Sequence, residues 1–134
     1  MRSLVTSVGV VLLSLVFSFS VSGQTQPALR EVPVKGVITL LDLGANKCIP
    51  CKMMAPILAE LKKEYAGRMH VEFIDVGEKP EEARKYGIRM IPTQVFLAAN
   101  GKELYRHVGF FSKEDILKKW KELGVDLRVP RPGA

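Results

Sequence analysis

The sequence has few of the sulfur and nitrogen side chains that bind metals. It has only two cysteines, Cys48 and Cys51, and two histidines, His70 and His107. A structural metal site needs about four ligands at characteristic spacings, and the two histidines lie at the starts and ends of different predicted strands with no metal-type spacing. Residue 52 is a lysine, so the C-x-x-C-H pattern of haem attachment is absent. We therefore expect no metal site and no cofactor.

The sequence also lacks the pattern of a nucleic-acid-binding protein. Its formal net charge is +6, and part of that excess sits near the carboxyl end, in Lys118, Lys119, Lys121, Arg128 and Arg131. Nucleic-acid recognition calls for a basic stripe interleaved with exposed aromatic residues. These lysines instead have the spacing of the solvated face of a helix. We expect no nucleic-acid partner, and the chain contains no internal repeat.

One long hydrophobic run lies at the start of the chain. Met1-Arg2 is positive, residues 4–21 contain no polar groups except serine and threonine, and small residues follow up to Gly23. This layout is typical of a secretory signal over residues 1–23. An uncleaved anchor is the alternative, because a helix of that length reaches roughly 27 Å, close to a hydrocarbon core of about 30 Å. Either way we expect export, to the periplasm if the source is bacterial, where cysteines can pair.

The remaining residues are enough for one compact domain. Residues 24–36 form a polar lead-in, residues 37–127 the domain, and residues 128–134 a tail. We expect this domain to act as a monomer.

The pattern of apolar residues predicts an α/β domain. The expected elements are strands at 37–43, 71–76, 94–98 and 104–108, and helices at about 48–67, at 80–87 and after Ser112. Asn100-Gly101 predicts a hairpin between the last two strands, and Ser112 with Asp115 forms a capping box. The order β, α, β, α, β, β, α implies a mixed four-stranded sheet flanked by helices.

The cysteine pair lies at the junction of the first strand and the first long helix. A lone C-x-x-C fits a metal site, a structural staple or a redox pair. A helix N-terminus and the nearby Lys47 and Lys52 would favour a thiolate at Cys48. Cys51, one turn deeper, could then attack a mixed disulfide formed by Cys48. Pro50 suits the first helical turn. A purely structural disulfide that closes a four-residue loop would stabilise the fold by only about 2 kcal/mol. The position therefore favours a redox pair.

Two further residues stand out near the predicted junction. Asp42 interrupts the apolar strand six residues before Cys48. If buried, its pKa would be raised by desolvation and it could exchange a proton with Cys51; alternatively, it reaches water at the strand end. Pro92 precedes a predicted strand, so it must end a loop or adopt the cis form.

Taken together, these motifs resemble those of the thioredoxin family. The stretches that carry the resemblance are CIPCKMMAPIL, YGIRMIPTQVFL, NGKEL and HVGFFSKEDI, within residues 37–124. The resemblance implies a thioredoxin-like fold and a redox-active disulfide between Cys48, the nucleophile, and Cys51, the resolving thiol. It further implies that Asp42 is a buried acid and base, and that Pro92 is a cis-proline beside the sulfurs.

The resemblance also implies a surface on which substrate proteins dock. Its members would be Lys47, Ile49, Pro50, Ile91, Thr93 and Gly109. Two of these depart from the family pattern: Lys47 replaces a tryptophan and Ile49 replaces a glycine. A third departure is Val71, which stands where the family places a lysine beside the buried aspartate.

We therefore predict a thiol:disulfide oxidoreductase that reduces protein disulfides outside the cytoplasm. Its substrates would be disulfide-containing or dithiol proteins, and a membrane electron-transfer partner would recharge it. The alternative is a binding or chaperone module that uses the same surface, with incidental redox chemistry.

Overall fold

The structure is a computed structural model that describes residues 32–128. The predicted leader and most of the lead-in and tail lie outside these residues. Within the described part, no helix is both long and apolar enough to cross a membrane.

The seven elements follow the predicted order. They are β1 (Ile38–Gly44), α1 (Ile49–Glu64), β2 (Met69–Asp75), α2 (Pro80–Lys85), β3 (Thr93–Leu97), β4 (Glu103–Val108) and α3 (Lys113–Glu122). The largest difference at the start of a strand is in β2, which begins at Met69, two residues earlier than predicted. The reason is its pairing with β1, which places Met69 beside Ile38 in the buried register.

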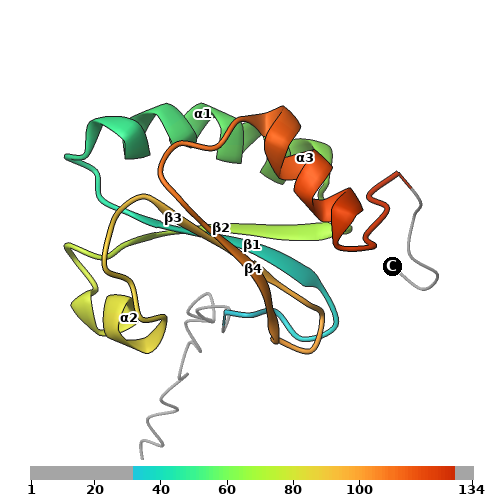
Figure 1. Cartoon of the computed structure of the whole chain (residues 1–134), viewed down its shortest axis with the longest axis horizontal. Helices are drawn as coiled ribbons and strands as arrows, with labels where there is room; N and C mark the ends of the chain where they lie inside the picture. Colours follow the sequence, from blue (N-terminus) through green and yellow to red (C-terminus); the bar gives the residue numbers. More distant parts are fainter. Residues whose placement is uncertain (1–31, 129–134) are drawn as a thin grey trace, which may run out of the picture.

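The four strands form one mixed sheet in the order β2-β1-β3-β4. β1 runs parallel to β2 and antiparallel to β3, and β3 and β4 form an antiparallel hairpin (Figure 1). At the hairpin tip, Gly101 adopts a φ of +84°, which a glycine tolerates without strain. The predicted mixed sheet is therefore confirmed.

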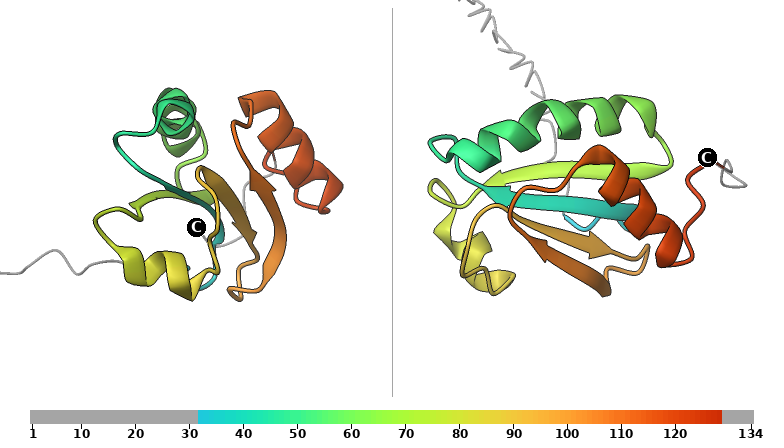
Figure 2. Two further views of the ribbon diagram at one scale, coloured as in Figure 1. Left: turned by 60° about the vertical axis from the view of Figure 1, so that its left-hand side comes forward. Right: turned by 45° about the horizontal axis from the view of Figure 1, so that its top comes forward.

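Helices cover both faces of the sheet. α1 and α3 lie over one face and α2 over the other, as the views in Figures 1 and 2 show. Because side chains alternate along a strand, Leu40 of β1 packs under α1 and α3, whereas Leu41 packs on the opposite face. Each such side chain stabilises the fold by about 1.5–3 kcal/mol through burial.

The carboxyl-terminal helix is fixed against the sheet and against α1. Ser112 caps α3, since its Oγ accepts a hydrogen bond of 3.1 Å from the Asp115 backbone N–H. Trp120 is fully buried against Phe96, and Lys113 pairs with two glutamates of α1, Glu60 and Glu64. These contacts fix α3 on the sheet and beside the carboxyl-terminal part of α1.

Candidate active site

Cys48 and Cys51 form a disulfide at the start of α1, with Cα atoms 5.2 Å apart. Cys48 is the N-cap residue, and its Sγ accepts a hydrogen bond of 3.4 Å from the Cys51 backbone N–H. Pro50 occupies the first turn, where no intrahelical N–H donor is lost. Cys48 is half-buried, whereas Cys51 is only 3% exposed. An incoming sulfur can therefore reach Cys48 far more easily than Cys51.

The loop before Cys48 is held by Asp75 at the end of β2. The Asp75 carboxylate accepts hydrogen bonds from the backbone N–H groups of Asn46, at 2.9 Å, and Gly77, at 2.8 Å. These donors, Asn46 first, lower the pKa of Asp75, so it is ionised at neutral pH. Asp75 is not among the site residues predicted from the sequence, although an aspartate two residues before a glycine at a strand end is typical of an Asx turn.

The sulfur of Cys51 lies directly over the last residue of β1. A Cβ atom added to Gly44 would lie 3.1 Å from Cys51 Sγ and 2.9 Å from Cε2 of Phe73. The buried sulfur, the Phe73 ring and the end of β1 are therefore in close contact, and a glycine is required where they meet.

Asp42 is buried on the face of the sheet that carries Cys51. It precedes Gly44 by two residues in β1, so their side-chain positions point to the same face. Asp42 is 0% exposed, which rules out the interpretation that it reaches water. Its Oδ1 accepts a hydrogen bond of 2.6 Å from Gln94 Nε2, and its Oδ2 has no partner among the described residues. Desolvation raises the pKa of Asp42 to about 6, an effect that the Gln94 hydrogen bond partly offsets.

Pro92 lies at the same end of the sheet as the cysteines. Leu43, near the end of β1, pairs with Thr93 at the start of β3, so the residue before Thr93 falls beside the start of α1. The Ile91–Pro92 peptide is cis, and the carbonyl of Pro92 accepts a hydrogen bond of 2.8 Å from the Gly109 N–H. The chain thus brings Pro92 and Gly109 together next to the helix that bears the disulfide.

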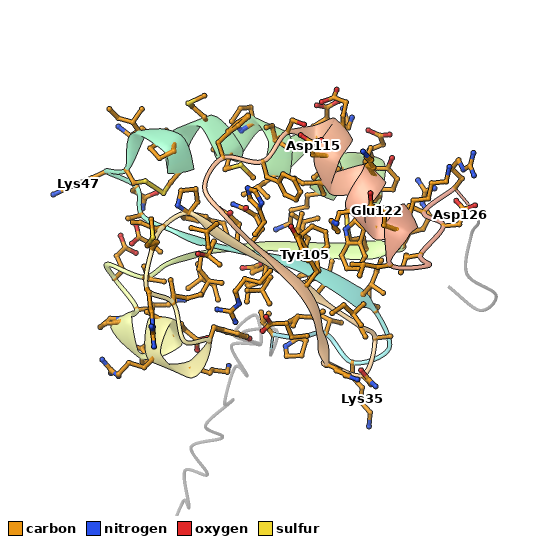
Figure 3. The ribbon with its side chains drawn as sticks, in the orientation of Figure 1. Lys35, Lys47, Tyr105, Asp115, Glu122 and Asp126 are labelled. Atoms are coloured by element: carbon orange, nitrogen blue, oxygen red, sulfur yellow. A yellow bond between two sulfur atoms is a disulfide. The ribbon has the colours of Figure 1, made fainter. Side chains whose placement is uncertain are left out.

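The other predicted docking residues divide into exposed and supporting ones. Lys47 is exposed, and Figure 3 shows it pointing away from the sheet at the tip of the loop before α1. Ile49 is 75% exposed, while Pro50 and Ile91 are half-buried. Thr93 differs from the expectation because its side chain is 2% exposed and its hydroxyl donates to the Met90 carbonyl at 2.6 Å. It supports the loop before β3 and does not line the exposed surface.

The two histidines lie on opposite edges of the sheet. His70 belongs to β2, with its ring 3.5 Å from Glu72, and His107 belongs to β4 and stacks on Phe111. Because β2 and β4 are the two edge strands, neither pattern nor geometry joins these rings to the cysteines in one ligand set. Among residues 32–128 no group of three or more histidine, cysteine or acidic side chains could hold a metal ion.

Sequence analysis also missed Gln94. It is the one amide in the strand Thr93–Leu97, and both it and Asp42 are fully buried. The available signal was a single polar residue in an apolar run directly after the Ile-Pro-Thr loop.

Comparison with known proteins agrees with this geometry. The sequence model of the Thioredoxin family matches residues 28–122. The M-type chloroplastic thioredoxin of Pisum sativum is 42% identical over 89 residues, which cover 66% of this chain and 48% of that protein. The chain thus spans about half the length of this relative. Thioredoxin of Staphylococcus aureus is 39% identical over 83 residues, covering 62% of this chain and 79% of that one.

A solved structure has the same fold. It is titled "Structure of a malarial protein", is 27% identical, and superposes with a TM-score of 0.62 over 66% of this chain and 99% of that one. The family match, the mixed sheet and the cysteine pair at the start of α1 lead to one conclusion. The chain belongs to the thioredoxin family and is a thioredoxin-like disulfide oxidoreductase.

Proposed function

We propose that this protein reduces disulfide bonds of other proteins outside the cytoplasm. The observation that supports it most is the asymmetry of the disulfide: Cys48 is half-buried at a helix N-terminus and Cys51 is 3% exposed beneath it. A helix N-terminus stabilises a thiolate, and the thiolate is the form that attacks a disulfide.

The reaction takes two exchange steps. In the first, the Cys48 thiolate attacks one sulfur of the substrate disulfide, forms a mixed disulfide and releases the other substrate sulfur as a thiolate. In the second, Cys51 loses its proton and attacks Cys48 Sγ, which breaks the bond to the substrate and forms the Cys48–Cys51 disulfide. Both substrate sulfurs leave reduced and take up protons, and the two cysteines are oxidised.

Asp42 is the group we assign to the proton of Cys51. It is buried on the same face as Cys51 Sγ, and burial raises its pKa to about 6. A base with a pKa near the working pH is ionised often enough to accept a proton, yet basic enough to be useful. Pro92 and Gly109, held together by a hydrogen bond, form the opposite side of the substrate site.

Export and the recharging partner belong to the same proposal. The support for export is the signal-like or anchor-like run at residues 4–21, which lies outside the described residues. A reductant in an oxidising compartment must regain two electrons after each turnover. We propose that a membrane electron-transfer protein delivers them to the Cys48–Cys51 disulfide, and that the protein acts as a monomer.

The test is insulin reduction by the domain of residues 24–134, with a dithiol as electron source. Cys48→Ser should abolish turnover. Cys51→Ser, a matched change three residues away, should instead accumulate a covalent mixed disulfide with insulin that a reductant releases. Full turnover by Cys48→Ser would refute the proposed mechanism.

The direction of electron flow is tested by the reduction potential of the cysteine pair in defined thiol buffers. A reduction potential of about −270 mV is expected for a reductant. A value near about −120 mV, typical of a strong oxidant, would show that the protein delivers disulfides instead.

A second function is supported by the exposed apolar side chains near the disulfide. Ile49, Met53, Met90, Val108 and Phe110 are between 43% and 75% exposed. A binding module would hold unfolded proteins through them, with no need of the sulfurs. It predicts undiminished client binding by the Cys48→Ser, Cys51→Ser double variant and weaker binding after Ile49→Ser with Met90→Ser. Loss of binding in the cysteine double variant would contradict it.

A further inference from the structure

Asp42 and Gln94 form an isolated polar pair in the apolar interior. They lie directly opposite each other in the register of β1 and β3, both are 0% exposed, and Gln94 Nε2 donates to Asp42 Oδ1 at 2.6 Å. Two atoms of the pair, Asp42 Oδ2 and Gln94 Oε1, have no partner among the described residues. The pair therefore has an acceptor on each side chain that the present hydrogen bond does not use.

Among residues 32–128, no charged group contributes to the shift in the pKa of Asp42. Its neighbour from β2 is Phe73 and its neighbour from β3 is Gln94, and α1 places the sulfur of Cys51 over Gly44, two residues along the same face of β1. The next titratable side chain in the row is His107 of β4, which lies beyond Gln94. Burial raises the pKa of Asp42, and the hydrogen bond from Gln94 partly offsets that rise.

The amide of Gln94 differs in its chemistry from a lysine, the residue that the family resemblance implies near the buried aspartate but that Val71 replaces in this chain. A lysine can only donate, so it stabilises the ionised carboxylate alone. An amide has both a donor and an acceptor on one planar group. Its N–H₂ can donate to an ionised carboxylate, and after a half-turn of the amide its oxygen can accept from a protonated one.

We propose that Gln94 is the positioning residue for proton transfer in the resolving step, serving Asp42 in both of its protonation states. The inference rests on the proposed function. When Cys51 attacks Cys48 Sγ, its proton passes to Asp42, and the bond from Cys48 to the substrate breaks. The Gln94 amide then turns so that Oε1 accepts from the new carboxyl O–H, and it turns back when Asp42 releases the proton to solvent or to a thiolate.

The first experiment follows the carboxyl carbon of Asp42 by NMR as a function of pH in the oxidised protein. Wild type should titrate near pH 6. Gln94→Met keeps the size and shape of the side chain but removes its hydrogen bond, so the midpoint should rise by about one pH unit. Thr39→Val is the matched control, because Thr39 is equally buried in β1 but has no hydrogen bond to Asp42. An unchanged midpoint in Gln94→Met would overturn the inference.

The second experiment measures the resolving step itself. Reduced protein is mixed with one equivalent of a chromogenic aromatic disulfide, which releases one coloured thiol on attack by Cys48 and a second on attack by Cys51. In the wild-type protein, the second release should become slower when the pH is lowered below the Asp42 midpoint. In Gln94→Met, this slowing should begin at a higher pH. Asp42→Asn should lower the rate of the second release by about 100-fold and remove the inflection.

The double variant decides between a positioning role and a merely structural one. Because Gln94 acts through Asp42, adding Gln94→Met to Asp42→Asn should slow the second release no further. Independent, multiplying losses would overturn the inference. Release of coloured thiol by Cys48→Ser at the wild-type rate would contradict the proposed function, whereas normal two-step release with no effect of Gln94→Met would overturn this inference alone.

If Gln94→Met does not fold, the wild-type protein still gives the answer. The side-chain amide resonances of Gln94 should shift between pH 5 and pH 8 with the same midpoint as the Asp42 carboxyl carbon. Amide resonances that stay constant through the Asp42 titration would overturn the inference.

Discussion

The two faces of the sheet bury different kinds of side chain at the same end of the molecule. On the face covered by α2, the ends of β1 and β3 carry Leu41, Leu43 and Val95 in an apolar cluster, and the one buried hydroxyl beside them, that of Thr93, is hydrogen-bonded to the Met90 carbonyl. On the face covered by α1 and α3, the neighbouring positions carry Asp42 and Gln94, beneath Cys51. The polar pair is therefore not a property of the strands in general, but of the face that carries the sulfurs.

This contrast indicates what each face does. Burying an incompletely paired carboxyl group destabilises the fold, and nothing on the α2 face calls for such a group. Beneath Cys51, the same burial raises the pKa of Asp42 toward neutrality and so makes it useful as a proton acceptor. The face covered by α2 contributes packing alone. The face covered by α1 and α3 contains a buried titratable group that costs stability but can serve the chemistry of Cys51.

The largest expected effect is on the packing face. Leu41→Ala should lower the free energy of unfolding by about 2–5 kcal/mol, because it removes a fully buried side chain and leaves a cavity. Activity per folded molecule should not change. Urea unfolding and insulin turnover, with Leu40→Ala as the matched change on the other face, test this. If Leu41→Ala loses more turnover than its unfolded fraction explains, the face covered by α2 does not serve packing alone.

In contrast to Leu41→Ala, Asp42→Asn should raise the free energy of unfolding at neutral pH. The pKa of Asp42 is raised from 3.8 to about 6 in the folded protein, so the folded state binds more protons than the unfolded state between these values. The contribution of Asp42 to the free energy of unfolding of the wild-type protein is therefore lost as the pH rises from about 4 to above 6. The loss amounts to up to about 3 kcal/mol. Asparagine does not titrate and should escape this loss.

Unfolding of both proteins at pH 4 and at pH 7.5 measures this difference. The advantage of Asp42→Asn over wild type should be larger at pH 7.5 than at pH 4. An advantage that is the same at both pH values would mean that Asp42 does not carry the proposed shift.

Gly44→Ala should have a smaller effect, of about 1–3 kcal/mol. The added methyl group would lie 2.9 Å from the Phe73 ring and 3.1 Å from Cys51 Sγ, and only the partly exposed ring can move. Phe73→Leu in the same chain should recover part of the loss. Thermal unfolding of the single and double variants gives the answer, and a neutral Gly44→Ala would show that this face is loosely packed.

The smallest expected effect is at the loop before Cys48. Asp75→Ala removes the carboxylate that holds the Asn46 N–H, so Cys48 should be positioned less well and insulin turnover should fall by less than about tenfold. Glu78→Ala, a nearby exposed acidic residue, is the control and should leave turnover unchanged. Equal turnover in both variants would mean that Asp75 does not position the site.

The sequence was most informative where a structural signal is local. The Asn100-Gly101 turn and the Ser112 cap each depend on a few consecutive residues, and both are found where they were predicted. The order of elements followed from periodicity, and together these predict the fold class. The cysteine pair was placed correctly at the start of α1 because a strand ends and a helix begins within six residues.

The missed residues depend on contacts between distant parts of the chain. Whether Gln94 faces the sulfurs or α2 depends on the register of β3 against β1, and a one-residue slip would reverse it. Asp75 acts on Asn46, 29 residues earlier. Thr93, which was expected on the docking surface, is the exception, because its hydroxyl bonds to the carbonyl of Met90 only three residues earlier. The local sequence marks Asp75 and Gln94 as polar residues at a turn and in an apolar strand, but it does not identify the distant groups that they contact.

The measurement that tests the central claim most directly is alkylation of the reduced protein as a function of pH, with the modified cysteine located by mass spectrometry. The account predicts that Cys48 is modified first, with an apparent pKa below the usual value of about 8.5, and that Cys51 stays protected until the fold opens. Equal modification of both cysteines, or modification of Cys51 first, would contradict it.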